Sequence, residues 1–268
     1  RAALPRGRRA AITAAVHRPA GERISVLSSL FQKFTRREPF AAPQPEEPLC
    51  VIGDVHGCFP QLIKLLEKVP PGHRCVLVGD YIDRGEQSAE VLRHLSGRED
   101  LTCLMGNHEA MLLEFLEEPA REGGRWLRNG GLQTLASFGI RGVRPLMNGT
   151  ELEDCRDRLL AAMGAELTGW LAQLRTSVLS GNVLITHAGA DPEKPADQQE
   201  DAVLIWGHPA FLRRRRRDSV WVVHGHTIVS RPAAEDGRIA IDTGAFAGGP
   251  LSAVCLDGTA AAFLEARP

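Results

Sequence analysis

The stretch Val51-Ile52-Gly53-Asp54-Val55-His56-Gly57 decides how the chain folds. Its apolar start indicates a buried strand, and the glycines around Asp54 and His56 indicate a tight turn directly after that strand. Because side chains two residues apart in extended backbone point the same way, Asp54 and His56 are expected to face one site. A buried, hydrogen-bonded aspartate is the alternative interpretation of this stretch taken alone.

An apolar strand followed by a polar turn recurs four more times along the chain. The further units are 75–85 with Asp80, Asp83 and Arg84; 101–109 with Asn107 and His108; 183–189 with His187; and 220–227 with His226. Open α/β sheets bind ligands at the carboxyl ends of their strands. The repetition therefore predicts one site built from Asp, His and Asn donors. Such donors suit two hard-to-borderline divalent metal ions, Mn, Fe or Zn, better than a thiolate site would.

In chain order the turns read GDVHG, GDYIDRG, GNHE and GHT, beginning at residues 53, 79, 106 and 225. These motifs resemble the phosphoprotein phosphatase branch of the calcineurin-like metallophosphoesterases, in particular the bacterial and phage serine/threonine protein phosphatases. The resemblance covers residues 49–264. It implies an α/β fold of two packed mixed β-sheets flanked by helices, in the layer order α/β/β/α, and a metal-dependent phosphoric ester hydrolase.

The resemblance also implies a role for each metal-ligating residue. The first ion would be held by Asp54 and His56, both ions would be bridged by Asp80, and the second would be held by Asn107, His187 and His226. A water shared by the two ions would be the nucleophile, because metal binding lowers the pKa of water from 15.7 to about 7. Mn is the expected metal, with Fe or Zn as alternatives.

Three further residues are expected to act on the substrate. The guanidinium of Arg84 is suited to a bidentate contact with phosphate oxygens. His108 would protonate the leaving alkoxide and Asp83 would orient it, giving direct in-line hydrolysis without a covalent phosphoenzyme. The protein phosphatases add a second phosphate-binding arginine after the fourth polar turn, where Trp206-Gly207-His208-Pro209 offers none. Arg213 or a neighbour is a candidate substitute.

The expected substrate is a phosphorylated protein or a small phosphoester. The runner-up is symmetrical cleavage of dinucleoside tetraphosphates by relatives that, as the resemblance implies, lack an Asp at the Asp83 position and have Asp where this chain has Glu109. A non-catalytic phosphopeptide-binding scaffold is disfavoured because no metal donor has been replaced. DNA-processing nucleases of the wider superfamily usually end in Gly-His-x-His, whereas Ile228 occupies the last position here.

Composition sets broad limits on partners and compartment. The chain has 268 residues, is 43% hydrophobic and carries a net charge of -1, which gives no global electrostatic reason to expect a nucleic acid or a membrane as partner. The sequence has no apolar run long enough to predict a membrane span. Six cysteines without a Cys-x-x-Cys pair indicate free thiols in a reducing, cytoplasmic compartment. Cys58 is interpreted as a packing residue, with a redox-sensitive thiol as the alternative.

The first 48 residues differ from the rest of the chain. Residues 1–37 are rich in Arg and poor in acids, and a short helix is possible at 25–34. We interpret this part as a disordered extension or the product of an upstream start, with an organelle transit segment as the alternative. The proline-rich residues 41–48 are expected to be a linker. The catalytic domain is predicted to span residues 49–268.

Hydrophobic periodicity predicts the elements between the polar turns. Helices are expected near 60–69, 88–95, 108–116 and 157–175, and strands near 183–186, 220–223, 239–242, 252–256 and 260–264, which together imply a second sheet. Residues 125–131, with Trp126 and Asn129, are expected to be a loop in helical sequence that forms either a substrate wall or a turn anchored by the indole. The run Arg213–Arg217 is interpreted as a solvated loop, with capture of an acidic partner as the alternative. His208, His224 and Asp242 are expected to be structural or to lie behind the metal ligands.

Overall fold

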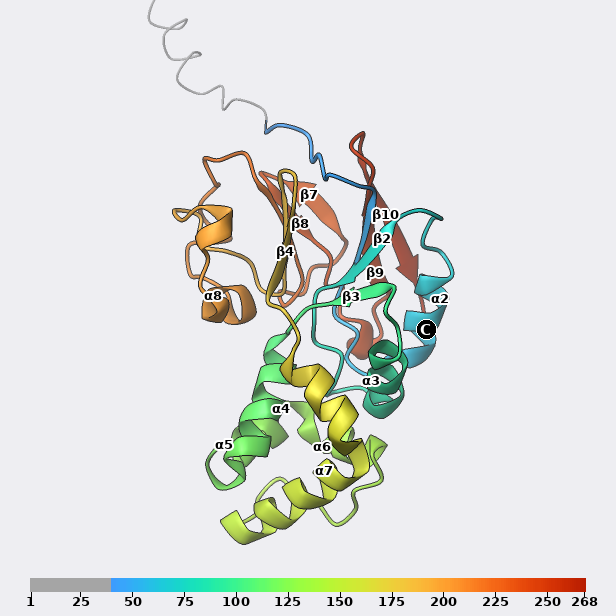
Figure 1. Ribbon diagram of the computed structural model, residues 1–268, viewed down its shortest axis with the longest axis vertical. Coiled ribbons are helices and arrows are strands. Elements are labelled where there is room, and N and C mark those ends of the chain that lie inside the picture. Colours follow the sequence, from blue (N-terminus) through green and yellow to red (C-terminus); the bar gives the residue numbers. More distant parts are fainter. Residues whose placement is uncertain (1–39) are drawn as a thin grey trace, which may run out of the picture. The chain divides into compact units, whose positions relative to one another are not determined.

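The structure, a computed structural model, describes residues 40–268 (Figure 1). The chain divides into two units, Arg1–Pro39 and Phe40–Pro268. The helix expected at 25–34 and most of the basic extension lie outside the described residues, so those expectations stay predictions. Within residues 40–268, no helix is both long and apolar enough to cross a membrane.

The first of two sheets has the strand order β10-β9-β1-β2-β3. Its strands are β1 (Leu49–Ile52), β2 (Arg74–Leu77), β3 (Leu101–Cys103), β9 (Leu251–Leu256) and β10 (Ala261–Ala266). The first three pair in parallel, as the alternation of strands and helices predicted. β9 and β10 add to this sheet antiparallel, β9 against β1. The last two strands of the chain therefore protect an edge of the first sheet instead of joining the second.

The second sheet has the order β4-β5-β6-β8-β7. Its strands are β4 (Ser177–Ser180), β5 (Val183–Thr186), β6 (Trp221–His224), β7 (Ala233–Glu235) and β8 (Arg238–Ala240). β5, β6 and β8 are parallel to one another. The carboxyl ends of β5 and β6 therefore lie at one edge of the sheet, which is the requirement for placing His187 and His226 in one site.

Successive side chains of β1 point alternately into two separate layers of the core. Leu49 and Val51 are buried in a cluster with residues of the second sheet, whereas Cys50 and Ile52 are buried in a cluster with the helices. Successive strand residues point to opposite faces, so a strand that is apolar throughout must be covered on both faces. The two sheets thus pack face to face, as the fold class predicted.

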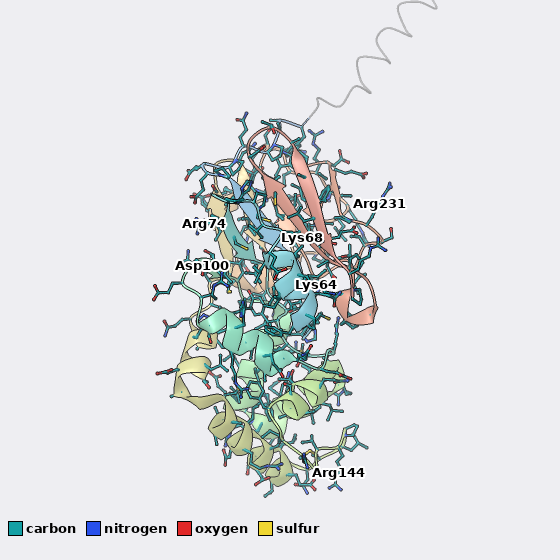
Figure 2. The ribbon with its side chains drawn as sticks, turned by 90° about the vertical axis from the view of Figure 1, so that its right-hand side faces the viewer. Lys64, Lys68, Arg74, Asp100, Arg144 and Arg231 are labelled. Carbon is teal, nitrogen blue, oxygen red and sulfur yellow. The ribbon has the colours of Figure 1, made fainter. Side chains whose placement is uncertain are left out.

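Helices cover the free face of the first sheet and extend below it (Figure 1). They are α2 (Phe59–Leu66), α3 (Ser88–Ser96), α4 (Asn107–Glu117), α5 (Pro119–Trp126), α6 (Leu132–Ser137) and α7 (Gly149–Ala172), with α8 (Asp201–Trp206) beside the second sheet. Figure 2 shows Lys64 on α2 and Lys68 in the turn after it, beside the last strand, where Lys68 Nζ lies 2.6 Å from the carbonyl oxygen of Glu265. The helix expected at 157–175 overlaps α7, which begins earlier, ends at Ala172 and is interrupted at Gly164 with φ 79°.

Residues 40–48, directly before β1, are docked on the second sheet although they form no helix or strand. The indole of Trp221 donates to the carbonyl of Ala41 at 2.6 Å, and the ring of Phe40 meets the Trp221 ring edge-on at 5.1 Å. The side chain of Asn182 donates to Ala42 and accepts from the backbone N–H of Gln44. The predicted linker is thus attached to the amino ends of β5 and β6.

Candidate metal centre and active site

All six predicted metal ligands lie directly after strands, at the edge where the two sheets meet. They are Asp54 and His56 after β1, Asp80 after β2, Asn107 after β3, His187 after β5 and His226 after β6. All except His226 are buried. The sequence rule that placed donors at the carboxyl ends of strands therefore brings residues from both sheets together.

Asn107 is the centre of one group of donors. Its side-chain oxygen lies 2.9 Å from His187 Nε2 and 2.8 Å from His226 Nδ1. Asp80 Oδ1 lies 3.4 Å from the same nitrogen of His187. Asp80, His187 and His226 offer ligand atoms within 4.8 Å of one another, which is the geometry needed to hold one metal ion.

Asp80 also belongs to a second group, with His56 and His108. Its Oδ2 lies 3.4 Å from His56 Nε2 and 3.9 Å from His108 Nε2. His56 Nδ1 lies 2.7 Å from the carbonyl of Ile82, so Nδ1 carries the proton and Nε2 keeps its lone pair for a metal. Asp80 therefore belongs to both groups of converging donors, and its bridging role stays a prediction.

The surroundings of the Asp54 carboxylate indicate whether cations fit this site. One carboxylate oxygen accepts from the backbone N–H of His226 at 3.0 Å, but the other is buried without a hydrogen-bond partner among residues 40–268. Burial, together with the charges of Asp242 and Asp80, raises the pKa of Asp54 well above its usual value. A buried, uncompensated carboxylate next to imidazole and amide donors fits divalent cations. Asp54 lies outside the two groups within 4.8 Å, so its ligand role stays a prediction.

His108 and Asp83 form a buried pair at the start of α4. His108 Nδ1 lies 2.6 Å from Asp83 Oδ2, and because a carboxylate only accepts, Nδ1 carries the hydrogen. Burial lowers the pKa of His108, but the carboxylates of Asp80 and Asp83 outweigh that effect and raise it overall. The free Nε2 faces the donor groups, which is the orientation a general acid requires.

Arg84 is half-buried and lies beside His56 and Phe246. Its guanidinium carbon is 4.7 Å from the centre of the Phe246 ring, and its Nη1 is 3.3 Å from His56 Nε2. The Phe246 ring also meets His56 edge-on at 5.1 Å. Sequence reasoning did not single out Phe246, because only the fold brings the turn before β9 against Arg84.

Glu109 is a second residue whose position the sequence did not reveal. Its carboxylate accepts from the backbone N–H groups of Asp80 and Tyr81, each at 2.8 Å, and of Gly106 at 3.0 Å. It thereby ties the turn after β2 to the turn after β3. The available signal was its spacing, three residues after the residue preceding a helix, which is typical of a capping carboxylate.

The two tentative substrate residues, Asn129 and Arg213, are exposed. Asn129 Nδ2 donates to the carbonyl of Arg125 at 2.9 Å, which caps the local turn. Within the described part of the chain, the Arg213 side chain makes no hydrogen bond or ion pair with a site residue. Their substrate-binding roles stay predictions.

Three of the five arginines in Arg213–Arg217 make internal contacts. Arg214 pairs with Glu193, and the Arg215 guanidinium lies 4.6 Å from the centre of the Phe40 ring. Arg216 is buried and donates to two backbone carbonyls, those of Asp191 and Lys194, both at 2.8 Å. Most of the run therefore serves to fix its own loop.

His208, His224 and Cys58 fit the structural interpretations. His224 Nδ1 lies 3.0 Å from the carbonyl of Gly225, and burial lowers the pKa of His224 to about 4. His208 accepts from the backbone N–H of Ala210 at 3.3 Å. Burial raises the pKa of the Cys58 thiol to about 11, which disfavours the reactive thiolate.

The chain belongs to the calcineurin-like phosphoesterase family, whose model matches residues 47–234. It is therefore a metal-dependent hydrolase of phosphoric esters. The chain is 30% identical over 232 residues to an asymmetrical bis(5'-nucleosyl)-tetraphosphatase, PrpE, of a Geobacillus species, covering 76% of this chain and 88% of that protein. It is 27% identical to serine/threonine-protein phosphatase 2 of Salmonella typhimurium, covering 75% and 89% respectively.

Two further likenesses bear on the substrate and the fold. Over 148 residues, covering 53% of this chain and 42% of the relative, the chain is 48% identical to a symmetrical bis(5'-nucleosyl)-tetraphosphatase of Pseudomonas fluorescens. The structure of a cold-active protein-tyrosine phosphatase from a Shewanella species aligns with a TM-score of 0.56 at 18% identity, covering 88% of this chain and 84% of that one. The latter likeness shows the fold alone.

Proposed function

We propose that the chain is a dinuclear-metal phosphomonoesterase that hydrolyses phosphoserine and phosphothreonine in proteins. The observation that carries this proposal is the buried pair of Asp83 and His108, with 2.6 Å between Oδ2 and Nδ1. A seryl or threonyl alkoxide is a poor leaving group that needs a proton from the enzyme. An imidazole held by a buried carboxylate is suited to supply it.

The proposed metal ligands divide as the resemblance implies. Asp54 and His56 would hold one ion, Asp80 would contact both, and Asn107, His187 and His226 would hold the other. When bound, divalent ions polarise phosphoryl oxygens and lower the pKa of water, which supplies a nucleophile at neutral pH. The fit rests on the two groups of converging donors that share Asp80.

The chain's own residues would perform the other steps. Arg84 would bind phosphate oxygens, with Phe246 holding its guanidinium. His108 Nε2 would donate its proton to the leaving oxygen while Nδ1–H stays hydrogen-bonded to Asp83. That arrangement permits in-line displacement without a covalent phosphoenzyme.

A symmetrical bis(5'-nucleosyl)-tetraphosphatase is the second candidate. It is favoured by the relatives of that name, including the one 48% identical over 148 residues. A nucleotide leaving group is a stabilised phosphate anion, so its departure needs little help from an acid. The retention of Asp83 behind His108 favours the phosphomonoesterase.

The deciding experiment compares kcat/KM for a phosphothreonine peptide and for diadenosine tetraphosphate under identical metal conditions. We expect the peptide to be preferred, and Asp83→Asn to lower activity on the peptide more than on any dinucleotide cleavage. A preference of about tenfold or more for the dinucleotide, worth about 1.4 kcal/mol of transition-state binding, would reverse the assignment. Phosphopeptide binding without turnover would instead indicate a scaffold.

A further inference from the structure

The segment from Trp126 to Thr134 wraps around Asp83. It begins at the last residue of α5, passes through a kink at Leu127–Gly131, where Gly130 has a non-helical φ of 111°, and continues into α6. The loop expected at 125–131 is thus a helical connection shaped around one carboxylate.

Every oxygen of the Asp83 carboxylate has donors from this segment. Trp126 Nε1 lies 3.0 Å from Oδ2 and 3.2 Å from Oδ1, and the Thr134 hydroxyl donates to Oδ1 at 2.6 Å. Oδ2 also receives the Nδ1–H of His108. Because Asp83 has no exposed surface, water cannot replace a donor that is lost.

The indole is itself held in place. Trp126 is fully buried, and its ring stacks on Phe115 with 4.7 Å between centroids and 27° between planes. A Cβ on Gly131 would lie 2.6 Å from the indole, so only glycine fits there. The ring therefore has one position, with its N–H directed at Asp83.

Gly130 brings the same segment against the phosphate-binding residue. Its φ is 111°, a conformation that favours glycine, and a Cβ there would lie 2.6 Å from the backbone nitrogen of Arg84. The carbonyl of Gly130 accepts from that nitrogen at 3.4 Å. Asp83 and Arg84 both have positive φ, 71° and 67°, so this contact supports a strained stretch.

We infer that Trp126 and Thr134 are positioning residues that fix the Asp83 carboxylate so that it holds His108 with Nε2 toward the leaving group. They thereby determine how well the enzyme cleaves esters with poor leaving groups. This inference rests on the proposed function of His108 as the general acid. The two glycines of the turn 129–131 make this arrangement possible. Gly131 leaves room for the Trp126 indole, and Gly130 lets the backbone approach Arg84.

The test uses Trp126→Phe, which removes the N–H but keeps an aromatic ring against Phe115, and Thr134→Val, which removes only the hydroxyl. Loss of one buried donor to a carboxylate should lower kcat on a phosphothreonine peptide about tenfold or more, with KM nearly unchanged. The effect on p-nitrophenyl phosphate should be less than about threefold, because that leaving group needs no proton. Thr134→Ser keeps the hydroxyl and should behave as the unmodified chain does.

Readouts other than turnover separate positioning from general damage. Metal content should stay unchanged in all variants, and the Nδ1–H signal of His108 in spectra of 15N-histidine-labelled protein should shift in Trp126→Phe and Thr134→Val but not in Thr134→Ser. If Trp126→Phe does not fold, the comparison of Thr134→Val with Thr134→Ser still tests the inference. Equal losses on both esters, or no loss on either, would overturn the inference.

The proposed function and this inference fail in different ways. An unmodified enzyme that prefers diadenosine tetraphosphate contradicts the proposed substrate. In that case kcat of the unmodified enzyme would be divided by kcat of Trp126→Phe or Thr134→Val, for a series of aryl phosphates that runs from p-nitrophenyl phosphate to phenyl phosphate. A ratio that rises as the leaving group becomes poorer supports the inference, and a flat ratio overturns it.

Discussion

At the scale of single residues, strain and hydrogen bonding concentrate on the same side chains. Non-glycine residues with positive φ include His56, Asp80, Asp83, Arg84 and His226. Such conformations cost about 1–3 kcal/mol each and persist only where the surroundings hold them. For Asp80, the backbone N–H donates to Glu109, and the carbonyl accepts from Val55 and His56 at 3.0 and 2.8 Å. The strain is thus offset by contacts from two neighbouring turns.

Asp80→Asn should abolish turnover and lower the bound metal per chain. Asp80 belongs to both groups of ligand atoms, and an amide would remove the one charge that serves both ions. Metal analysis and turnover on an aryl phosphate check this expectation. Asp100→Asn is the matched control, since Asp100 is a surface carboxylate paired with Arg98 (Figure 2). Full metal content and activity in Asp80→Asn would contradict the shared-ligand model.

Metal-stripped protein should regain activity with Mn more readily than with Mg. His56, His187 and His226 offer imidazole nitrogens, which suit Mn, Fe or Zn, whereas Mg prefers oxygen ligands and retains its waters. Activity would be titrated with each chloride after chelation. Turnover that survives thorough chelation, or that returns best with Mg, would be incompatible with the proposed site.

His108→Asn should lower kcat about 10²- to 10⁴-fold on a phosphothreonine peptide and much less on p-nitrophenyl phosphate. The reason is that His108 Nε2 is the proposed proton donor, whereas p-nitrophenolate leaves without a proton. His94→Asn on α3 is a control for loss of an imidazole elsewhere. Equal losses on both substrates would point to damage at the adjacent metal ligand Asn107 instead.

At the scale of elements, local patterns predicted what lies within one element and missed what depends on partners. The helix beginning near Pro60 and the parallel order of β1, β2 and β3 follow from periodicity and alternation. The pairing of β9 with β1 could not be predicted, because a sequence pattern that indicates a strand does not show which other strand it pairs with. The sequence did not predict α5, because Gly123 and Gly124 lower helix propensity. Close packing against α7 compensates for this low propensity. A Cβ on Gly123 would lie 2.7 Å from Leu152 of α7, so only glycine permits this close approach.

The same division holds for the site. The positions of the six proposed metal ligands were predictable because strand ends and residue types are visible in sequence, whereas their metal-binding roles stay predictions. The roles of Trp126 and Glu109 were not, because each depends on a side chain reaching another element. The sequence left open whether Trp126 belongs to a substrate wall or anchors a turn, and it gave no sign that the indole donates to Asp83.

Glu109→Gln should destabilise the connection between β2 and α4. The amide keeps one acceptor oxygen and turns an N–H group toward backbone donors of Asp80, Tyr81 or Gly106. A buried donor left unsatisfied costs about 1–3 kcal/mol, which denaturant unfolding would measure. Glu114→Gln, on the exposed side of the same helix, should have little effect. Equal stability of Glu109→Gln and the unmodified chain would show that the capping contact contributes little.

At the scale of the whole described molecule, the second sheet has different tasks at its two ends. His187 and His226 follow the carboxyl ends of β5 and β6, where the proposed chemistry occurs. Asn182 and Trp221 lie at the amino ends of the same strands, where residues 40–46 dock. Contacts at the amino ends should therefore affect stability more than catalysis.

Two truncations separate these tasks. Removing residues 1–39 should leave both turnover and Tm unchanged, because it keeps the contacts of Phe40, Ala41 and Gln44 with the second sheet. Removing residues 1–46 also deletes the Phe40 ring packed on Trp221 and the hydrogen bonds to Asn182 and Ser180. Full burial of one phenylalanine contributes about 1.5–3 kcal/mol, and Phe40 is half-buried, so the loss should lower Tm by about 2–6 °C. Thermal unfolding and turnover on an aryl phosphate at 20 °C below Tm would measure both effects.

Phe40→Ala in the chain lacking residues 1–39 is the matched variant, because it removes the ring but keeps the backbone contacts with Ala41 and Gln44. Its Tm should lie between those of the two truncations, while its kcat stays equal to theirs, since the ring lies at the end of the sheet opposite His187 and His226. A longer truncation as stable as the shorter one would show that residues 40–46 are only a linker, as their prolines suggested. A fall in kcat without a fall in Tm would mean that the amino ends of β5 and β6 are coupled to the metal ligands at their carboxyl ends.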